Sequence, residues 1–234
     1  MLKEVLTAII KKNVSGDVFE WLREKSTSTG TQFNTAFVTL PRKTGKKIIE
    51  LTTEENKAAQ SEGLYINNWS IDRLSRVWLL MHLDASDKEK YFSSIENLFA
   101  AGEMNELIAL YSALPVLQYP ELWKKRCAEG IRNNISDVLE SIICNNPYPS
   151  QNLDEPAWNQ LVLKAFFTEK PIEQIIGLDE RANAKLASTS YDFAHERLAA
   201  HRTVDPQLWR CIEPFANEKI FPDIKKIKDY VLQQ

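Results

Sequence analysis

The sequence contains very little glycine. Only 7 of its 234 residues are glycine, and neither a GxxxxGK[ST] nor a GxGxxG pattern occurs. Tight hairpin turns and phosphate-binding loops need glycine where φ is positive or where the backbone approaches closely. The scarcity therefore favours helices joined by short polar links, and it argues against a P-loop or a Rossmann nucleotide site.

Cysteines and long apolar runs are also scarce. Cys127, Cys144 and Cys211 lie far apart and form no CxxC pair, which predicts reduced, buried thiols. The first ten residues, MLKEVLTAII, include an acidic residue and no apolar core of signal-peptide length. Because no apolar run approaches the length of a membrane span, we expect a cytoplasmic protein without one.

Neither positive nor negative charge dominates the chain. The 29 basic and 32 acidic residues give a net charge of −3, and the two signs are interspersed. Binding to nucleic acid or to an anionic membrane would need a concentrated basic face. We therefore expect no nucleic-acid partner. The most basic segment, PRKTGKKIIE at 41–50, predicts a solvated connector, with phosphate binding as the alternative.

Helical periodicity runs through the whole chain, and strand signals are almost absent. The sequence predicts an all-α protein of roughly a dozen helices, packed as antiparallel pairs in a helical-repeat-like array or an irregular bundle. We expect one domain over 1–234, with a helical half at 1–115 and a motif-bearing half at 116–234. The longest predicted helix covers 121–145. A non-helical, proline-stiffened loop follows, and further helices are predicted over 156–167, 179–201 and from about 217.

Three groups of polar residues in the second half interrupt the helical pattern. A polar side chain among apolar neighbours needs a partner, so such groups indicate either a ligand site or a structural contact. The predicted ligand-binding residues are Glu129, Arg132, Asn133 and Asn134 in the first group, Arg181, Asn183, His195 and Arg197 in the second, and Tyr148, Asn159 and Lys164 in the third.

Gly130 lies within the first group. Glycine inside a helix costs about 1 kcal/mol relative to alanine, so it usually has a reason in packing or access. One interpretation is close approach of a neighbouring helix, with Glu129 and Arg132 as an i,i+3 ion pair. The other is that Gly130 opens space for a ligand held by Arg132 and Asn134.

His195 shares a helix face with Asp192 and Glu196, at a spacing that could bind a metal or couple the imidazole to a carboxylate. Neither HExxH nor HxxxH is present, and further ligands cannot be identified. We therefore expect no metal and no cofactor, and a solvated ion-pair face is the alternative interpretation.

Arg197 projects into a sector of its helix that should be buried. A buried guanidinium needs a carboxylate or a bound anion, and Glu129, Asp154 and Glu155 are the predicted partners. Asp154 is also expected to cap the helix 156–167, beside Pro156. An ion pair that joins two helices and a ligand site are both open interpretations of Arg197.

The same stretches resemble a known family. The segments RCAEGIRNN (126–134), NNPYPSQNLDEPAWNQLVLKAFF (145–167), GLDERANAKLA (177–187) and YDFAHERLAAHR (191–202) are similar to the signature of the EboA family. The likeness covers about residues 110–216, and the first hundred residues agree in helical pattern and length. It implies an all-helical protein encoded in the ebo gene cluster, beside a prenyltransferase-like membrane enzyme, a TatD-like hydrolase and TIM-barrel-like proteins. That cluster is associated with making or trafficking secondary metabolites.

Three functional hypotheses follow. The leading one is a non-catalytic binding or adaptor protein that holds a small anionic or prenylated metabolite, or another protein of the ebo cluster. The second is an enzyme that uses His195 with Asp192 or Glu196 as an acid–base pair and an arginine, Arg132 or Arg197, as anion clamp. The third is a purely structural scaffold. The sequence assigns no catalytic residue, ligand or oligomeric state.

Overall fold

Helices make up the regular structure of the computed structural model, which describes residues 1–216. Within that range the chain has fourteen α-helices, and its only β-type pairing is one isolated antiparallel bridge between Ile48 and Ser70. The predicted all-α class is therefore confirmed. The chain divides into two compact units, Met1–Ile142 and Ile143–Gln234.

The first unit is built on helices with clear polar starts. Thr52 and Glu55 form a capping box at α5, and the Asp87 carboxylate accepts hydrogen bonds from two backbone N–H groups at the start of α7. Such caps satisfy N–H groups that have no partner inside the helix. The helices are α1 (Leu2–Asn13), α2 (Gly16–Ser26), α3 (Gly30–Thr39), α4 (Pro41–Thr44), α5 (Thr53–Ser61), α6 (Ile71–Leu80), α7 (Lys88–Ala101), α8 (Met104–Ala113), α9 (Lys124–Ile131) and α10 (Ser136–Ile143).

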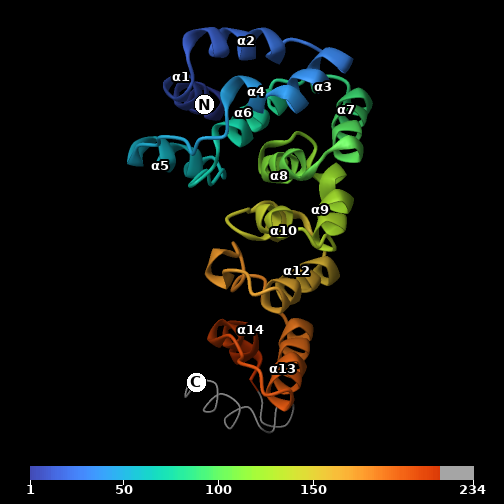
Figure 1. Ribbon diagram of the computed structural model, residues 1–234. Coiled ribbons are helices and arrows are strands. Elements are labelled where there is room, and N and C mark those ends of the chain that lie inside the picture. The colour runs from blue at the N-terminus through green and yellow to red at the C-terminus, as the bar shows by residue number, and fades with distance from the viewer. Residues whose placement is uncertain (217–234) are drawn as a thin grey trace. The chain divides into compact units, whose positions relative to one another are not determined.

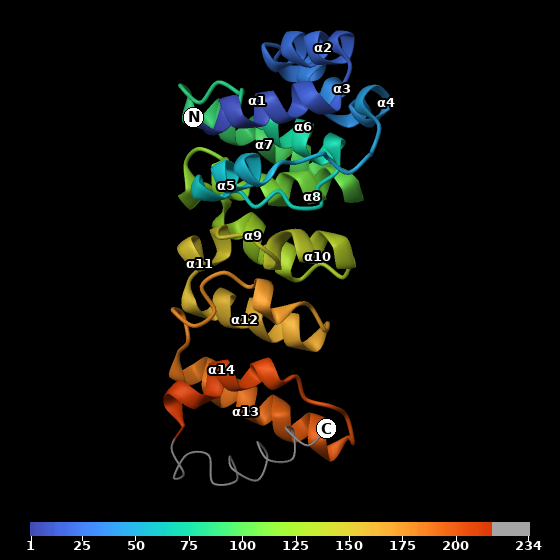
Figure 2. The ribbon, with the colours of Figure 1, turned by 90° about the vertical axis from the view of Figure 1, so that its left-hand side faces the viewer.

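Helix α6 forms the centre of the first unit. Nine of its ten residues are buried, and it packs against α1 on one side and α8 on the other (Figures 1 and 2). A helix that is buried nearly all round must place any charged side chain in the core, and α6 contains Asp72 and Arg76 among its buried residues.

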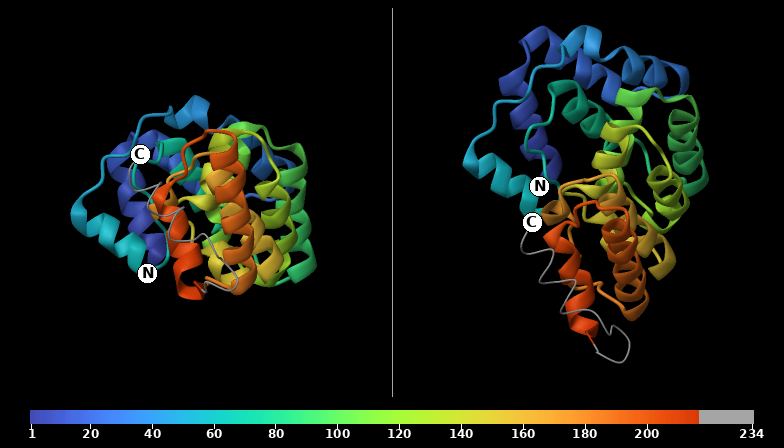
Figure 3. Two further views of the ribbon diagram at one scale, coloured as in Figure 1. Left: turned by 90° about the horizontal axis from the view of Figure 1, so that it is seen from below. Right: turned by 60° about the horizontal axis from the view of Figure 1, so that its bottom comes forward.

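The second unit contains four α-helices within the described range. They are α11 (Tyr148–Asn152), α12 (Glu155–Phe167), α13 (Ala184–Ala199) and α14 (Trp209–Ile212). The predicted stripe of α12 is confirmed, because Trp158, Leu161, Val162, Ala165 and Phe166 are all buried. Asp154 caps this helix as predicted, and its carboxylate accepts the Ala157 N–H at 3.0 Å. Helices α13 and α14, orange and red, lie side by side (Figure 3).

The predicted helix over 121–145 is wrong. The chain instead forms a 3₁₀ turn, Pro120–Trp123, then α9, and then α10 after a break at 132–135. In the break, the Asn133 side-chain oxygen accepts the Ile135 N–H at 2.8 Å. Asparagine side chains that bond to nearby backbone groups compete with helical hydrogen bonds. The break therefore follows from the local polar residues.

The predicted boundaries of three other segments also need correction. The proline-rich loop contains α11, because Pro147 and Pro149 lie at its start, where a helix needs no N–H donor. Helix α13 begins at Ala184 rather than near 179, because the Asn183 side chain accepts the Leu186 N–H and caps it. The connector 41–50 opens with the short α4. The helix predicted from about 217 lies outside the described residues.

Candidate functional site

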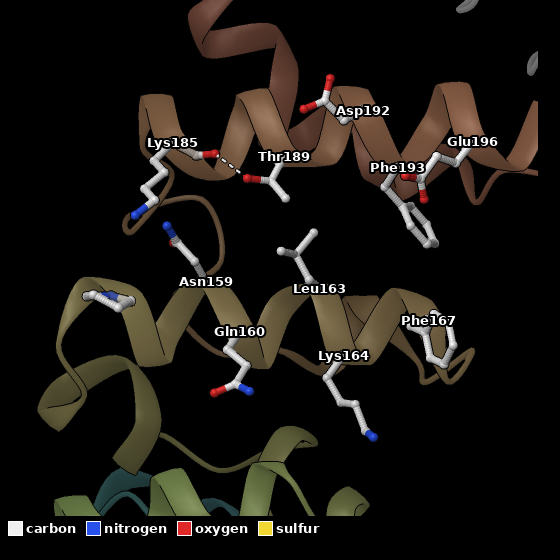
Figure 4. Close-up of a pocket in the computed structure, with 11 residues that line it drawn as sticks. Asn159, Gln160, Leu163, Lys164, Phe167, Lys185, Thr189, Asp192, Phe193 and Glu196 are labelled. Atoms are coloured by element: carbon white, nitrogen blue, oxygen red, sulfur yellow. Dashed lines mark hydrogen bonds between the residues drawn. The ribbon is translucent and has the colours of Figure 1, made fainter.

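A groove lies between α12 and α13 in the second unit (Figure 4). Its volume is about 550 Å³, within the range of small-molecule sites. Its walls are two stripes at helical spacing, which are Pro156, Asn159, Gln160, Leu163, Lys164 and Phe167 on α12, and Lys185, Thr189, Asp192, Phe193 and Glu196 on α13. The α12 stripe lies on the side of the helix away from its buried stripe, so one helix serves both the core and the groove.

The middle of the groove is apolar. Leu163 points from α12 toward α13, and Phe193 points from α13 toward α12 (Figure 4). Phe167 completes this wall, and its side chain is 68% exposed. A large, exposed aromatic side chain inside a concave surface is a common feature of binding sites.

Charged and amide groups flank the apolar centre. The Lys185 side chain and the Asn159 amide approach each other at one end of the groove, whereas Asp192 points away from α12 (Figure 4). Gln160 and Lys164 also point away from α13. Lys185 is therefore the cation best placed to meet a ligand at this end of the groove, while the Glu196 carboxylate lies beside Phe193 farther along α13 (Figure 4).

Two predicted site residues, Asn159 and Asn183, form a reciprocal amide pair. Each side-chain nitrogen donates to the other's oxygen, at 3.2 Å from Asn159 and 2.8 Å from Asn183. Asn183 caps α13 at the same time. The pair joins α12 to the start of α13, so it fixes one end of the groove rather than offering free hydrogen bonds to a ligand.

The Arg181 side chain, a predicted ligand-binding residue, binds backbone carbonyl groups. Its Nη1 group donates to the carbonyl oxygens of Pro149, Ser150 and Leu153, at 3.2, 3.1 and 2.9 Å. Its guanidinium also lies 5.0 Å from the centre of the Trp158 ring. These contacts satisfy carbonyl groups at the end of α11 and tie that helix to α12.

Arg197 lines a second, smaller cavity of about 470 Å³ beside Phe166, Phe193 and Val204. Its side chain is only 17% exposed, which agrees with the buried sector predicted for it. The partners predicted from sequence are wrong, because Arg197 Nε donates to the Thr203 carbonyl at 2.7 Å and Nη2 lies 3.5 Å from Glu169. Glu169 follows the end of α12, and no periodic signal identified it.

His195 is half-buried, and its ring packs edge-on against Tyr191 with the ring centres 4.5 Å apart. It does not line the groove. Among residues 1–216 it forms no ion pair with Asp192 or Glu196. Tyr148 is buried in α11, and it too is absent from the groove lining.

The first predicted group belongs to the first unit. Glu129 pairs with Arg126 at 3.1 Å. The packing interpretation proposed Arg132 as the partner of Glu129, and this pairing is wrong. Arg132 is exposed at the C-cap of α9, and Asn133 caps the following turn. Asn134 is exposed in the same break. These residues end one helix and begin the next.

Gly130 is explained by packing within the first unit. A β-carbon added there would lie 2.5 Å from Ile142 Cδ1 and 2.6 Å from Tyr111 Cζ. Both distances are too short for non-bonded carbon atoms, so only glycine fits between these side chains. Burial of Tyr111 raises its phenol pKa to about 12.

Two of the three thiols are buried as predicted, whereas the prediction is wrong for Cys144, which is only half-buried. Cys127 lies in the core of the first unit and Cys211 in that of the second. Burial raises the pKa of both thiols, that of Cys211 to about 12, which keeps them protonated and unreactive near neutral pH.

The described residues form an all-helical protein with an open, mainly apolar groove. Over residues 1–216, no cluster of histidine, cysteine and carboxylate side chains could hold a metal ion. In the same range, no helix has the length and apolarity needed to cross a membrane.

The chain belongs to the EboA family. The family model described as "Metabolite traffic protein EboA" matches residues 2–213, which confirms the predicted membership. The match includes the first hundred residues, where the sequence motifs gave no likeness beyond helical pattern and length. No curated protein and no solved structure matches the chain.

Proposed function

We propose that this member of the EboA family is a non-catalytic carrier that binds a small amphipathic acid in the groove between α12 and α13. The observation that carries the proposal is the exposure of Phe167 beside Leu163 and Phe193. Fully burying a phenylalanine side chain is worth about 1.5–3 kcal/mol, so a hydrocarbon covering Phe167 gains binding energy.

Lys185 sets the expected polarity of the ligand. Its ammonium group lies at the polar end of the groove, near Asn159, while Asp192 points away from α12 (Figure 4). A carboxylate or phosphate at that end would gain a charge-assisted hydrogen bond. The description of the family as metabolite traffic proteins supports a ligand that is carried rather than converted.

Calorimetric titration of the full chain tests the proposal. The probes are dodecanoate and dodecyltrimethylammonium below their critical micelle concentrations and dodecanol below its solubility limit. They differ in head-group charge and share one tail. We expect dodecanoate to bind most tightly. Failure of all three to bind contradicts the proposal, and preference for the cation shows that the carboxylates of α13, and not Lys185, set the polarity.

Matched variants locate the site. Phe167→Ser should weaken dodecanoate binding by about tenfold, because it removes on the order of 1.5 kcal/mol of apolar burial. Ile135→Ser, which changes an exposed apolar residue outside the groove, should leave binding unchanged. Lys185→Gln should remove the preference for dodecanoate over dodecanol, and Lys57→Gln should not.

The adaptor hypothesis, in which the surface holds another protein of the ebo cluster, stays a prediction. The same holds for a cytoplasmic location and for a role in secondary metabolism.

A further inference from the structure

A separate cavity lies in the first unit, where α4 and the end of α3 face α6 and the start of α8. Its volume is about 790 Å³, within the range of sites for small organic molecules. The basic segment 41–50 contributes Arg42 and Lys46 to its lining. This segment has two interpretations, a solvated connector and a phosphate-binding loop, and its position at a cavity favours the second.

The floor of this cavity is held by hydrogen bonds and ion pairs, and its one guanidinium and two carboxylates give it a formal charge of −1. Arg76 lines it with a side chain that is 1% exposed. Its guanidinium donates to Asp72 Oδ2 at 2.7 Å and to the Phe37 carbonyl at 2.9 Å, and it pairs with Glu106 at 3.3 Å. Two carboxylates outnumber the one buried positive charge, so the floor does not attract an anion, and any such attraction comes from the cations of the rim.

The rim carries an excess of positive charge. Arg42 and Lys46 are exposed, and neither side chain has a hydrogen bond or an ion pair within the described part of the chain. The opposing carboxylate, Glu103, is engaged in the capping box at the start of α8. At the rim, two cations against the one carboxylate of Glu103 favour an anionic group, while the other lining carboxylate, Glu106, is paired with Arg76 in the floor.

The rim also carries uncovered apolar surface. Val38 is 51% exposed and Met104 is 41% exposed, and both line this cavity. They come from opposite walls, Val38 from α3 and Met104 from α8. A purely inorganic anion would leave both side chains in water, whereas an anion with a short hydrocarbon part would cover them.

We propose that this cavity is a second ligand site, which takes a small organic anion made of a carboxylate or phosphate group on a short hydrocarbon. Arg42 and Lys46 bind the anionic group, and Val38 and Met104 contact the hydrocarbon. Arginine suits this role because its planar guanidinium matches two oxygens of a carboxylate or phosphate at once. The site is independent of the groove between α12 and α13.

Chemical-shift mapping on the ¹⁵N-labelled full chain tests this site. The probes are hexyl phosphate, inorganic phosphate and hexanol. We expect hexyl phosphate to give saturable shifts at the amides of residues 42–46 and 103–105, and the other two to bind more weakly. Absence of saturable shifts there, or equal binding of inorganic phosphate, overturns the proposal.

Charge-matched variants distinguish the site from general attraction. The double variant Arg42→Gln with Lys46→Gln should weaken hexyl phosphate binding by on the order of tenfold or more, since it removes two charge-assisted contacts. The control, Lys47→Gln with Lys57→Gln, removes the same charge from exposed residues outside the cavity. Equal weakening by both pairs overturns the proposal. Phe167→Ser should leave this site unchanged, which separates its failure from that of the groove.

A lipid headgroup could supply the same phosphate chemistry. Cosedimentation with phosphatidylglycerol vesicles distinguishes that source, and we expect no binding that depends on Arg42 and Lys46. Binding that the double variant abolishes would replace the small-molecule ligand with a membrane surface and so overturn the proposal.

Discussion

The two units use polar side chains in different ways. In the first unit, Asp72, Arg76 and Glu106 form a network of charges in the core. In the second, Arg181 and the Asn159–Asn183 pair tie loops and helix ends together at the edges. A buried charge network is intolerant of losing one member, whereas ties at the edges stabilise their surroundings more modestly. The comparison teaches that polar residues in a helical pattern do not by themselves mark a binding site.

The largest expected effect is the loss of Arg76. Arg76→Met leaves the carboxylates of Asp72 and Glu106 buried without their cation, which should lower the free energy of unfolding by about 3–5 kcal/mol. Denaturant unfolding measures this loss. In the same samples, thiol labelling should expose Cys127 of the first unit sooner, with little change at Cys211. Equal exposure of both thiols would break the distinction between the units.

Gly130→Ala should be the next most damaging change. The added β-carbon must displace Ile142 or Tyr111, and such overpacking typically costs about 1–3 kcal/mol. Gly16→Ala is the matched control, because nothing lies within 4 Å of a β-carbon at that position. Thermal unfolding of the two variants gives the comparison, and equal melting temperatures would remove the packing explanation.

Arg181→Met should destabilise the second unit by about 1–2 kcal/mol. The variant keeps an apolar side chain beside Trp158 and loses the three hydrogen bonds to carbonyl groups of 149–153. We expect faster amide exchange at α11 than in the parent chain, measured by hydrogen–deuterium exchange. Unchanged exchange at α11 would show that Arg181 does not hold this helix.

The smallest expected effect concerns the ion pair between Asp179 and Arg210, 2.7 Å apart. The hydrogen bond from Arg210 lowers the pKa of Asp179 from its ordinary value of 3.8. The stabilisation is therefore complete above pH 3.8 and lost as the pH falls through the lowered value. Asp179→Asn should abolish this part of the acid dependence of unfolding, while Glu180→Gln, next to it and exposed, should retain it.

The fold could be predicted from sequence where apolar residues recur at helical spacing throughout a segment. The stripe of α12 from Trp158 to Phe166 and the Asp154 cap are local patterns, and both are confirmed. The break after α9 could not be predicted from the helical period, because it depends on the competition between the Asn133 side chain and the helical hydrogen bonds of the backbone. The start of α13 at Ala184 could not be predicted for a similar reason, because it depends on the Asn183 side chain that caps the helix.

The groove could be predicted only in part. Asn159 and Lys164 were identified because they are polar in an apolar segment, and both line it. Phe167 and Leu163 were not, because an apolar residue at helical spacing is indistinguishable from core until its neighbours are known. The sequence also gave no reason to examine Arg76, whose partners come from α6 and α8.

We propose above that the groove between α12 and α13 binds a ligand. The most direct test maps backbone chemical shifts of the ¹⁵N-labelled full chain during titration with dodecanoate. We expect saturable shifts along α12 and α13, centred on Leu163, Phe167 and Phe193, and their loss in Phe167→Ser. Saturable binding that leaves these helices unshifted, or no binding at all, would contradict it.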